Sequence, residues 1–307
     1  MVQENCVKPK IVIITGPTGV GKSAAAVEVA KRFNGEIIGA DSMQIYKGFD
    51  IGTGKVTQAE MQGIRHRMID IVEPDDEFSV GDYVERVKPE IDEIVSAGKL
   101  PVIVGGTVFY LNALLGGFNF ATAPKDDLIR EELKREAEER GDEYIYEKLK
   151  KIDPISASNI SINDTKRLIR ALEIYFITGK PKSEVASLSE CPYDYDLIYL
   201  TDDRKVLYER IERRVDGMVR DGLVEEAKGF YHLRDKQSMQ AIGYKELVEY
   251  FDGNITLDEA IAKIKINSRH YAKRQLTFIR SLKFEKTEIN CTDYDTLYQN
   301  ISEFLKV

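Results

Sequence analysis

Short apolar runs alternate with longer amphipathic stretches over the first part of the chain. Continuous apolar runs are typical of strands buried on both faces of a parallel sheet, and amphipathic stretches are typical of the helices that cover such a sheet. We predict strands at residues 11–15, 36–40, 100–104 and 197–201. We predict helices at residues 23–33, 80–97 and 108–115. This order indicates an α/β fold with a parallel sheet flanked by helices.

The middle of the chain has a different pattern. Residues 119–193 contain no comparable strand run, and their apolar positions recur at intervals of three and four. One helix is predicted at 164–178, because Gly179 and a following proline provide typical helix-stop chemistry. We therefore predict an all-helical insertion at 119–193, within a core formed by residues 1–118 and 194–307.

The last hundred residues are predicted to be mainly helical. Thr256 and Glu259 match a capping box, and the helix behind them carries an apolar stripe. The predicted basic helix at residues 263–286 holds eight lysines and arginines against one acidic residue, and residues 166–170 form a smaller basic cluster. A charge run of this kind is usually a solvated helix face, but it is also what contact with a phosphate backbone requires.

Composition narrows the class of protein without deciding its function. The 307 residues are 43% hydrophobic and 31% charged, which is typical of a globular domain. The net charge of −8 argues against a protein that coats nucleic acid by bulk charge. No apolar run approaches the roughly 20 residues of a membrane span, and no signal peptide is evident, so we expect a cytoplasmic protein. The three cysteines are far apart in the sequence, which argues against a disulfide framework. The three histidines are scattered, which argues against a metal cluster.

A glycine-rich loop between the first predicted strand and helix provides the strongest chemical signal. It matches G-x-x-x-x-G-K-[ST], in which backbone amides and a helix N-terminus surround phosphate oxygens. Lys22 would add a point charge, and the Ser23 hydroxyl would reach a phosphate-bound Mg²⁺. The alternative is a glycine-rich turn without a ligand. We predict a di- or triphosphate site in a P-loop NTPase-like sheet, formed by Gly16, Pro17, Thr18, Gly19, Val20, Gly21, Lys22 and Ser23.

Two further positions follow predicted strands and should face the same crevice, since ligands bind beyond the carboxyl ends of parallel strands. Asp41 is a candidate Mg²⁺ ligand or general base, but an aspartate in an Asx-turn or helix cap fits equally well. Thr107 follows Gly105 and Gly106. Either it caps the next helix in a tight turn, or the small residues leave room for a ligand to which Thr107 donates.

Six segments together resemble the bacterial tRNA dimethylallyltransferase family, in the order the family has them. They are residues 16–23, 41–55, 105–115, 163–174, 240–247 and 271–280. The resemblance implies transfer of a dimethylallyl group from dimethylallyl diphosphate to N6 of adenine 37, beside the tRNA anticodon. It implies that Mg²⁺ assists, that the loop holds a prenyl diphosphate rather than ATP, and that the partner is the tRNA anticodon arm. Nothing in the sequence indicates an obligate dimer, so we expect a monomer.

The resemblance also implies roles for individual residues. Asp41 would be the base that accepts the proton from N6, and Thr107 would lie by the reacting centre. Contacts with tRNA would involve Asp41, Ser42, Met43, Gln44, Arg130, Lys166, Arg167, Leu168, Ile169, Arg170, Lys273 and Arg274. This chain departs from the usual family pattern at residues 65–67, at Val108 and at Phe278.

Three alternatives differ in class. A small-molecule kinase would also use a phosphate loop in a parallel sheet, but would not need the basic helices. A prenyltransferase acting on free adenine nucleotides would not need the helical insertion. A nucleic-acid-binding module with a non-catalytic loop would not need Lys22, Ser23 and Asp41 intact.

Overall fold

The computed structural model describes residues 8–116, 125–185 and 191–306. Its main feature is a six-stranded sheet in the order β3-β2-β4-β1-β5-β6, in which every neighbouring pair is parallel. The strands are β1 (Lys10–Thr15), β2 (Gly35–Gly39), β3 (His66–Arg67), β4 (Leu100–Val104), β5 (Asp194–Thr201) and β6 (Thr287–Asn290). The predicted α/β class with a parallel sheet is confirmed.

The helices belong to two compact units of the chain, residues 1–113 with 192–307 and residues 114–191. Those beginning in the first unit are α1 (Lys22–Arg32), α2 (Gln58–Met61), α3 (Val80–Ser96), α4 (Val108–Leu115), α10 (Arg204–Arg220), α11 (Leu223–Gly229), α12 (Tyr244–Phe251), α13 (Leu257–Ser281) and α14 (Tyr294–Leu305). Those of the second unit are α5 (Asp127–Arg140), α6 (Asp142–Ile152), α7 (Pro154–Ser158), α8 (Thr165–Thr178) and α9 (Lys182–Val185). The second unit overlaps most of the predicted insertion.

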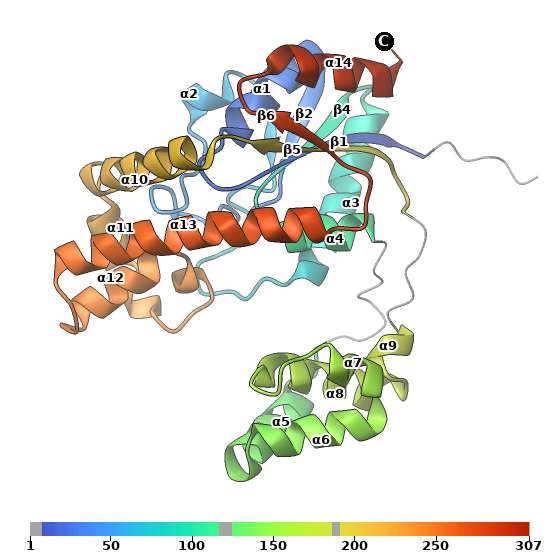
Figure 1. Cartoon of the computed structure of the whole chain (residues 1–307), viewed down its shortest axis with the longest axis vertical. Helices are drawn as coiled ribbons and strands as arrows, with labels where there is room; N and C mark the ends of the chain where they lie inside the picture. Colours follow the sequence, from blue (N-terminus) through green and yellow to red (C-terminus); the bar gives the residue numbers. More distant parts are fainter. Residues whose placement is uncertain (1–7, 117–124, 186–190, 307) are drawn as a thin grey trace, which may run out of the picture. The chain divides into compact units, whose positions relative to one another are not determined.

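The sheet of the first unit has helices on both faces. Figure 1 shows α1 and α14 on one side, with α3 and α13 on the other. The apolar side chains of β1, β2 and β4 are almost completely buried, as expected for parallel strands covered on both faces. On the α1 side, Val12 and Ile14 share a core with Val29 of α1 and with Leu297 and Ile301 of α14. This packing fixes the ends of the central strands.

The strand order brings three loops together. Strands β2, β4 and β1 are neighbours, so the segments that follow them emerge at the same edge of the sheet. The amide of Gly105 donates to the carbonyl of Ile14 (3.3 Å), and the amide of Thr107 donates to the carbonyl of Ala40 (3.1 Å). The Thr15 hydroxyl donates to the Gly105 carbonyl (2.9 Å). The loops after β1, β2 and β4 therefore form one continuous surface.

The second unit has its own hydrophobic core, formed by α5, α6, α7 and α8. Its largest contributors include Leu133, Ile145, Leu149 and Leu172, all of which are buried. The N-terminus of α8 is capped by Asp164, whose carboxylate accepts a hydrogen bond from the Arg167 amide. These helices form without a strand among the described residues of the unit, as the apolar periodicity predicts.

Two strands and one helix end differ from the sequence prediction. The two-residue β3 and the four-residue β6 were not predicted, because neither contains an apolar run. The basic helix was predicted to reach Lys286, but α13 ends at Ser281 and the chain then pairs with β5 as β6. The local sequence pattern does not mark the end of this helix. The helix ends where the chain leaves α13 on its way into the sheet as β6. None of the helices in the described ranges is long and apolar enough to cross a membrane.

One departure from the family pattern has a structural explanation. Arg67 of β3 is 6% exposed, and its guanidinium contacts three carboxylates. It pairs with Glu36 of β2 (2.8 Å) and with Glu90 (2.5 Å) and Glu93 (2.8 Å) of α3. These ion pairs hold the short edge strand against the sheet and α3. Arg67 therefore serves the fold at this position.

Candidate active site

The phosphate loop lies between β1 and α1, as predicted. Gly16, Gly19 and Gly21 have positive φ angles, which let the backbone curl in a way that side-chain-bearing residues rarely adopt. The α-helix then begins at Lys22, so its N-terminus faces the loop. The Lys22 ammonium donates to the Pro17 carbonyl (2.9 Å) and spans the loop. Backbone amides, a helix N-terminus and a lysine thus converge, which is the arrangement that binds phosphate oxygens.

Two side chains from distant segments fix this loop. The buried Gln275 of α13 accepts from the Thr18 amide (2.8 Å) and donates to the Gly106 carbonyl (2.8 Å). A Cβ at Gly106 would lie 2.3 Å from the Gln275 amide nitrogen, so this contact requires glycine. Arg210 of α10 donates to the Gly19 carbonyl (3.2 Å). The Thr18 amide therefore anchors the loop to α13.

The charge state of Lys22 depends on its neighbours. Desolvation by the surrounding protein lowers the pKa of Lys22 to about 8. The carboxylate of Asp41 opposes this shift, and the guanidinium of Arg214 adds to it. Desolvation also lowers the pKa of Arg214, again opposed by Asp41. One carboxylate thus lies close enough to influence two cations, and an added anion would stabilise both charges.

The sequence left open whether Asp41 is part of an Asx-turn or a group that acts on a ligand, and the structure allows both. Its Oδ1 accepts from the amides of Met43 (2.9 Å) and Gln44 (3.4 Å), which is an Asx-turn. Its Oδ2 makes no hydrogen bond with any residue in the described ranges. The turn orients the carboxylate, and the second oxygen is left for a ligand. The structural and the chemical interpretations of Asp41 are therefore compatible.

Thr107 connects the loop after β4 to the loop after β2. Its hydroxyl oxygen accepts from the Ser42 amide (2.9 Å) and lies 3.3 Å from the Ser42 hydroxyl. Tyr271 of α13 approaches the same place: burial raises the pKa of Tyr271 to about 12, and hydrogen bonds with Gln275 and Thr107 oppose that rise. Thr107 therefore lies against Ser42, the residue that follows Asp41.

A pocket of about 330 Å³ opens beside these groups. Its polar lining includes Thr18, Asp41, Ser42, Arg214 and Arg274. Its apolar lining consists of side chains from α10, α13 and the segment before α12, namely Ile211, Val215, Met218, Ile242 and Ile264. We call this cavity the central pocket. It has a phosphate-loop side, a carboxylate and an apolar wall.

Not every residue predicted to contact a ligand reaches the pocket. Ser42 and Met43 line it together with Asp41. The side-chain amide of Gln44 instead donates to the carbonyls of Thr53 (3.3 Å) and Gly54 (3.2 Å). Gln44 thus holds the loop that forms part of the pocket wall.

Within the helical insertion, the predicted contact residues divide into two groups. Lys166 and Arg167 are exposed, although Arg167 also pairs with Asp164, the cap residue of its own helix (3.3 Å). Leu168 and Ile169 are buried in the core of the unit, at 0% and 7% exposure, because they lie on the inner face of α8. The expectation that these two side chains contact RNA is corrected accordingly. Arg130 (2.9 Å) and Arg170 (2.7 Å) both pair with the buried Glu173, which commits part of their charge to the fold.

The basic character of α13 is also divided. Its first half is paired with acidic residues of neighbouring helices: Lys263 with Glu249, Lys265 with Asp216, and Arg269 with Glu212. The cations in the first half of α13 therefore fit the interpretation of the charge run as a solvated helix face. Lys273 and Arg274 are exposed further along the helix, where Arg274 lies over the Tyr271 ring (5.8 Å) and lines the pocket. The basic surface next to the pocket is therefore smaller than the sequence indicates.

Sequence reasoning missed three residues that shape the site: Arg214, Gln275 and Glu226. Each lies in a helix whose local pattern is ordinary, and each acts on a segment far away in the chain. The Arg214 guanidinium, for example, donates to the Gly54 carbonyl (3.4 Å) across 160 positions. No spacing rule connects such residues, although Gln275 does lie within the 271–280 segment that carries the family resemblance.

Comparisons with known proteins agree with this geometry. The profile of the IPP transferase family matches residues 44–282. A tRNA dimethylallyltransferase of Bacillus cereus is 49% identical over 290 residues, covering 93% of this chain and 91% of that protein. The structure of a tRNA isopentenylpyrophosphate transferase from Bacillus halodurans is 45% identical with a TM-score of 0.72, covering 97% and 99% of the two chains.

A eukaryotic dimethylallyltransferase solved while acting on tRNA is 30% identical, with a TM-score of 0.83 over 96% of this chain and 77% of that one. The family profile matches more than half of the chain, and the bacterial relatives match nearly all of it. The chain is therefore a member of the IPP transferase family.

Proposed function

We propose that this protein transfers a dimethylallyl group from dimethylallyl diphosphate to N6 of adenine 37 in tRNA, and releases diphosphate. The observation that carries the proposal is the composition of the central pocket. Thr18 of the phosphate loop, a carboxylate with one free oxygen and an apolar wall meet there. These three parts correspond to the three chemical parts of the reaction: the leaving diphosphate, the attacking amine and the transferred five-carbon group.

The reaction balances with the groups present. The lone pair of N6 forms a bond to C1 of the dimethylallyl group while the C1–O bond breaks, and its electrons leave with the diphosphate. Lys22, the loop amides and the N-terminus of α1 stabilise the charge that develops on that oxygen. The proton lost from N6 moves to Asp41 Oδ2, which the Asx-turn holds in place. Thr107 supports this geometry by binding the amide of Ser42, next to Asp41.

The diphosphate also changes the protonation of the site. The free enzyme holds Lys22 at a pKa of about 8, mainly because of desolvation. A bound anion favours the charged ammonium and therefore raises this pKa. Lys22 thus enters the reaction fully charged at neutral pH, when stabilisation of the leaving group is needed.

The apolar wall would accommodate the five-carbon chain. Its members project from α10, α13 and the segment before α12, so they lie beside the phosphate loop and not within it. Burial of a small branched hydrocarbon against Ile, Val and Met side chains is favourable at about 25 cal/mol per Å².

The residues present fit a magnesium ion. Ser23 is exposed on the first turn of α1, next to the loop. Mg²⁺ commonly takes one or two protein ligands and completes its shell with phosphate oxygens and water, so a single hydroxyl is sufficient. When bound, the ion would neutralise charge on the diphosphate. The described residues contain no cluster of three or more His, Cys, Asp or Glu that would indicate a different metal.

The acceptor base must leave its stack to reach Asp41, which costs a few kcal/mol and is easier in a single-stranded loop. Arg274 is exposed and lines the pocket, its neighbour Lys273 is exposed on the same helix, and the insertion exposes Lys166 and Arg167. We propose that these four residues contact the phosphates of the anticodon arm. These two groups of exposed cations concentrate positive charge locally in a chain whose net charge is −8.

The test is mass spectrometry of purified tRNA incubated with the protein, Mg²⁺ and dimethylallyl diphosphate. In the expected product a C₅H₉ group replaces one N6 hydrogen of the adenine next to the anticodon, so the mass increases by C₅H₈. Parallel reactions offer AMP as acceptor, and γ-labelled ATP as donor. Prenylation of AMP but not tRNA would support the free-nucleotide alternative, and phosphate transfer from ATP would support the kinase alternative. Either result would overturn the proposal.

A further inference from the structure

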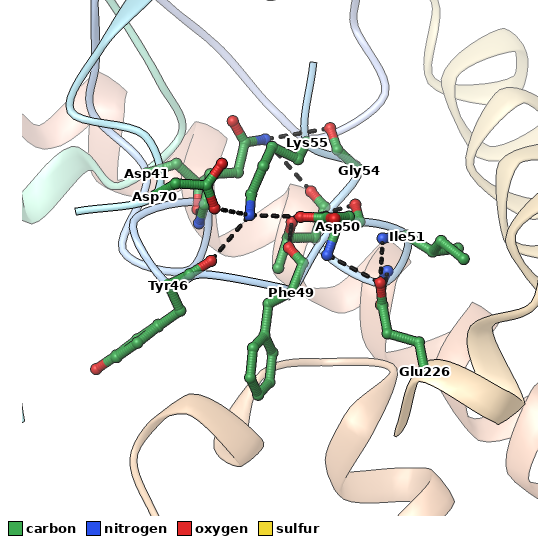
Figure 2. Close-up of polar contacts among 12 residues, drawn as sticks. Asp41, Tyr46, Phe49, Asp50, Ile51, Gly54, Lys55, Asp70 and Glu226 are labelled. Carbon is green, nitrogen blue, oxygen red and sulfur yellow. Dashed lines mark hydrogen bonds and ion pairs between the residues drawn. The ribbon is translucent and has the colours of Figure 1, made fainter. Parts of the chain in front are cut away.

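One carboxylate outside the central pocket accepts four hydrogen bonds. Oε2 of Glu226, in α11, accepts from the amides of Asp50 (2.9 Å) and Ile51 (2.8 Å). Its Oε1 accepts from the amide of Gly52 (2.9 Å) and from the Tyr244 hydroxyl (2.5 Å). Figure 2 shows Glu226 beneath the turn, with the amides directed toward it. Three successive backbone amides on one side chain form an anion nest that is filled by the protein itself.

The same turn is held from its other side by Lys55. The Lys55 ammonium donates to the Tyr46 carbonyl (2.8 Å) and to the carboxylates of Asp50 (2.6 Å) and Asp70. Its side chain is only 6% exposed, and it lies at the centre of these three acceptors in Figure 2. The turn at residues 50–52 is therefore fixed between one buried cation and one anion. Such networks rigidify a backbone when every member is satisfied.

The turn shapes the pocket on the side that faces Asp41. Gly52 and Thr53 line the central pocket. The carbonyls of Thr53 and Gly54 bind the Gln44 side chain, and the Gly54 carbonyl also accepts from Arg214. A displacement of the turn would therefore move part of the pocket wall and two side chains beside the proposed reacting centre.

The packing of the turn leaves little freedom. A Cβ at Gly52 would lie 2.5 Å from the ring of Tyr244, so the turn approaches this tyrosine as closely as its backbone allows. Tyr244 itself is completely buried and donates to Glu226. Burial and the neighbouring Glu226 carboxylate raise the pKa of Tyr244 far above its usual range, so it remains a donor throughout the working pH range.

We propose that Glu226 is a positioning residue for the acceptor side of the reaction. It acts through the turn at residues 50–52, which sets the pocket wall and the position of Arg214 relative to Asp41. Glu226 does not touch the reacting atoms, because both of its oxygens are occupied by the turn and Tyr244. This inference rests on the proposed prenyl transfer to an adenine.

A glutamine cannot replace Glu226 in this position. All four partners are donors, and a glutamine offers one acceptor oxygen together with a donating NH₂ group. Glu226→Gln would therefore place its NH₂ group against backbone N–H donors and leave at least one amide of the turn without its acceptor. Glu226→Asp keeps the charge but is one methylene shorter, so it should restore part of the function. Glu225→Gln is the matched control, since Glu225 is the exposed neighbour on the same helix.

The experiment measures three quantities for the wild-type protein and each variant. The first is kcat and KM for tRNA at saturating dimethylallyl diphosphate. The second is the inhibition constant of inorganic pyrophosphate. The third is hydrogen exchange of the amides at residues 50–52. For Glu226→Gln we expect faster exchange at these amides and a loss of kcat/KM for tRNA of about 10²-fold, typical of a misplaced reacting group.

Inhibition by pyrophosphate should stay within about twofold of wild type, because Gln275 and Arg210, and not Glu226, anchor the phosphate loop. Glu225→Gln should match wild type in all three measurements, and Glu226→Asp should lie between wild type and Glu226→Gln. Wild-type kcat/KM in Glu226→Gln would overturn the inference. So would an equal loss of pyrophosphate affinity, which would indicate general disruption of the fold.

Failure of the inference is distinguishable from failure of the proposed function. If the wild-type protein does not prenylate tRNA, the proposed function is wrong, and the inference that depends on it fails with it. If the wild-type protein is active and Glu226→Gln is equally active, the inference alone is wrong.

Discussion

The two sides of the central pocket are built in different ways. The phosphate side is one continuous segment between β1 and α1, whose glycines and helix N-terminus create the site from local backbone geometry. The acceptor side is the segment at residues 41–55, whose shape depends on contacts with helices that come much later in the chain. Glu226 binds Ile51 from 175 residues away.

The locally built side binds a group that many substrates share, the diphosphate. The side built from distant segments recognises one particular group, the adenine amine. A diphosphate looks the same in many substrates, and a short loop with suitable backbone angles is enough to bind it. An adenine amine must be placed against a base and an electrophile together, which requires several elements fixed relative to one another. Asp41 connects the two sides, since its carboxylate acts on both Lys22 and Arg214.

Replacement of Asp41 should have the largest effect. Asp41→Ala should abolish prenylation while tRNA still binds. Asp41→Asn keeps an oxygen that can accept from Met43 and Gln44, so it separates the turn from the base. We expect Asp41→Asn to lower kcat by about 10³-fold, within the usual range for general base catalysis. If Asp41→Asn formed product at the wild-type rate in a single-turnover assay, the carboxylate would matter only for the turn.

Lys22 tests the phosphate side alone. Lys22→Met should weaken pyrophosphate binding by about 10²-fold, in the range of a lost charge-stabilising donor. Because Lys22 has a pKa of about 8 in the free protein, its contribution is present below pH 8 and is lost as the pH rises further. The measurement is the ratio of wild-type to Lys22→Met affinity from pH 6.5 to 9.5, in which the titration of pyrophosphate cancels. A ratio independent of pH would contradict this assignment.

The exposed cations should give a smaller and salt-dependent effect. Arg274→Gln and Arg167→Gln should each weaken tRNA binding by several-fold and reduce the slope of log K against log salt by about 0.7 to 0.9. Lys263→Gln is the control on the same helix as Arg274, because Lys263 pairs with Glu249 of a neighbouring helix and does not line the pocket. Binding isotherms at several salt concentrations make the comparison. An equal loss in Lys263→Gln would mean that bulk charge, and not local contact, attracts the RNA.

A change outside both sides of the pocket should alter stability and leave catalysis intact. Burial raises the pKa of Asp196 in β5 to about 6, although Asn300 of α14 donates to it (2.7 Å). The folded state therefore binds its proton more tightly than the unfolded state, and the contribution of Asp196 to stability falls as the pH rises from about 4 to 6.

Asp196→Asn should consequently raise the free energy of unfolding at pH 7 by roughly 1 to 2 kcal/mol and have little effect at pH 4. Asp194→Asn is the matched control, with the same change of charge at an exposed position on the same strand. Denaturant unfolding at the two pH values measures both. Equal stabilisation by the two variants would attribute the gain to net charge.

Local patterns predicted most of the central sheet because its strands are buried on both faces and therefore uniformly apolar. β1 and β4 match their predicted ranges closely, and α3 begins at Val80 as predicted. The edge strands β3 and β6 have mixed composition and were missed. Their formation depends on pairing with β2 and β5, which no local pattern records.

The same distinction applies to charge. The eight cations at residues 263–286 left open a solvated helix face or a contact with a phosphate backbone, and several of them pair with acids on other helices. Leu168 and Ile169 lie within a basic cluster in the sequence and are buried in the structure. A run of residues in sequence becomes two faces of a helix in space, and only the packing decides which face each residue joins.

The sequence by itself determined the phosphate loop, because eight consecutive residues include both the glycines that can adopt the required backbone angles and the lysine that supplies the charge. It also determined the α/β class, through runs of apolar residues whose period depends only on neighbours in the chain. The tertiary structure alone decided how Arg214, Gln275 and Glu226 meet the loops at the ends of the strands. These contacts join segments more than a hundred residues apart, and hydrogen bonding between such segments depends on the folded path of the backbone rather than on sequence spacing.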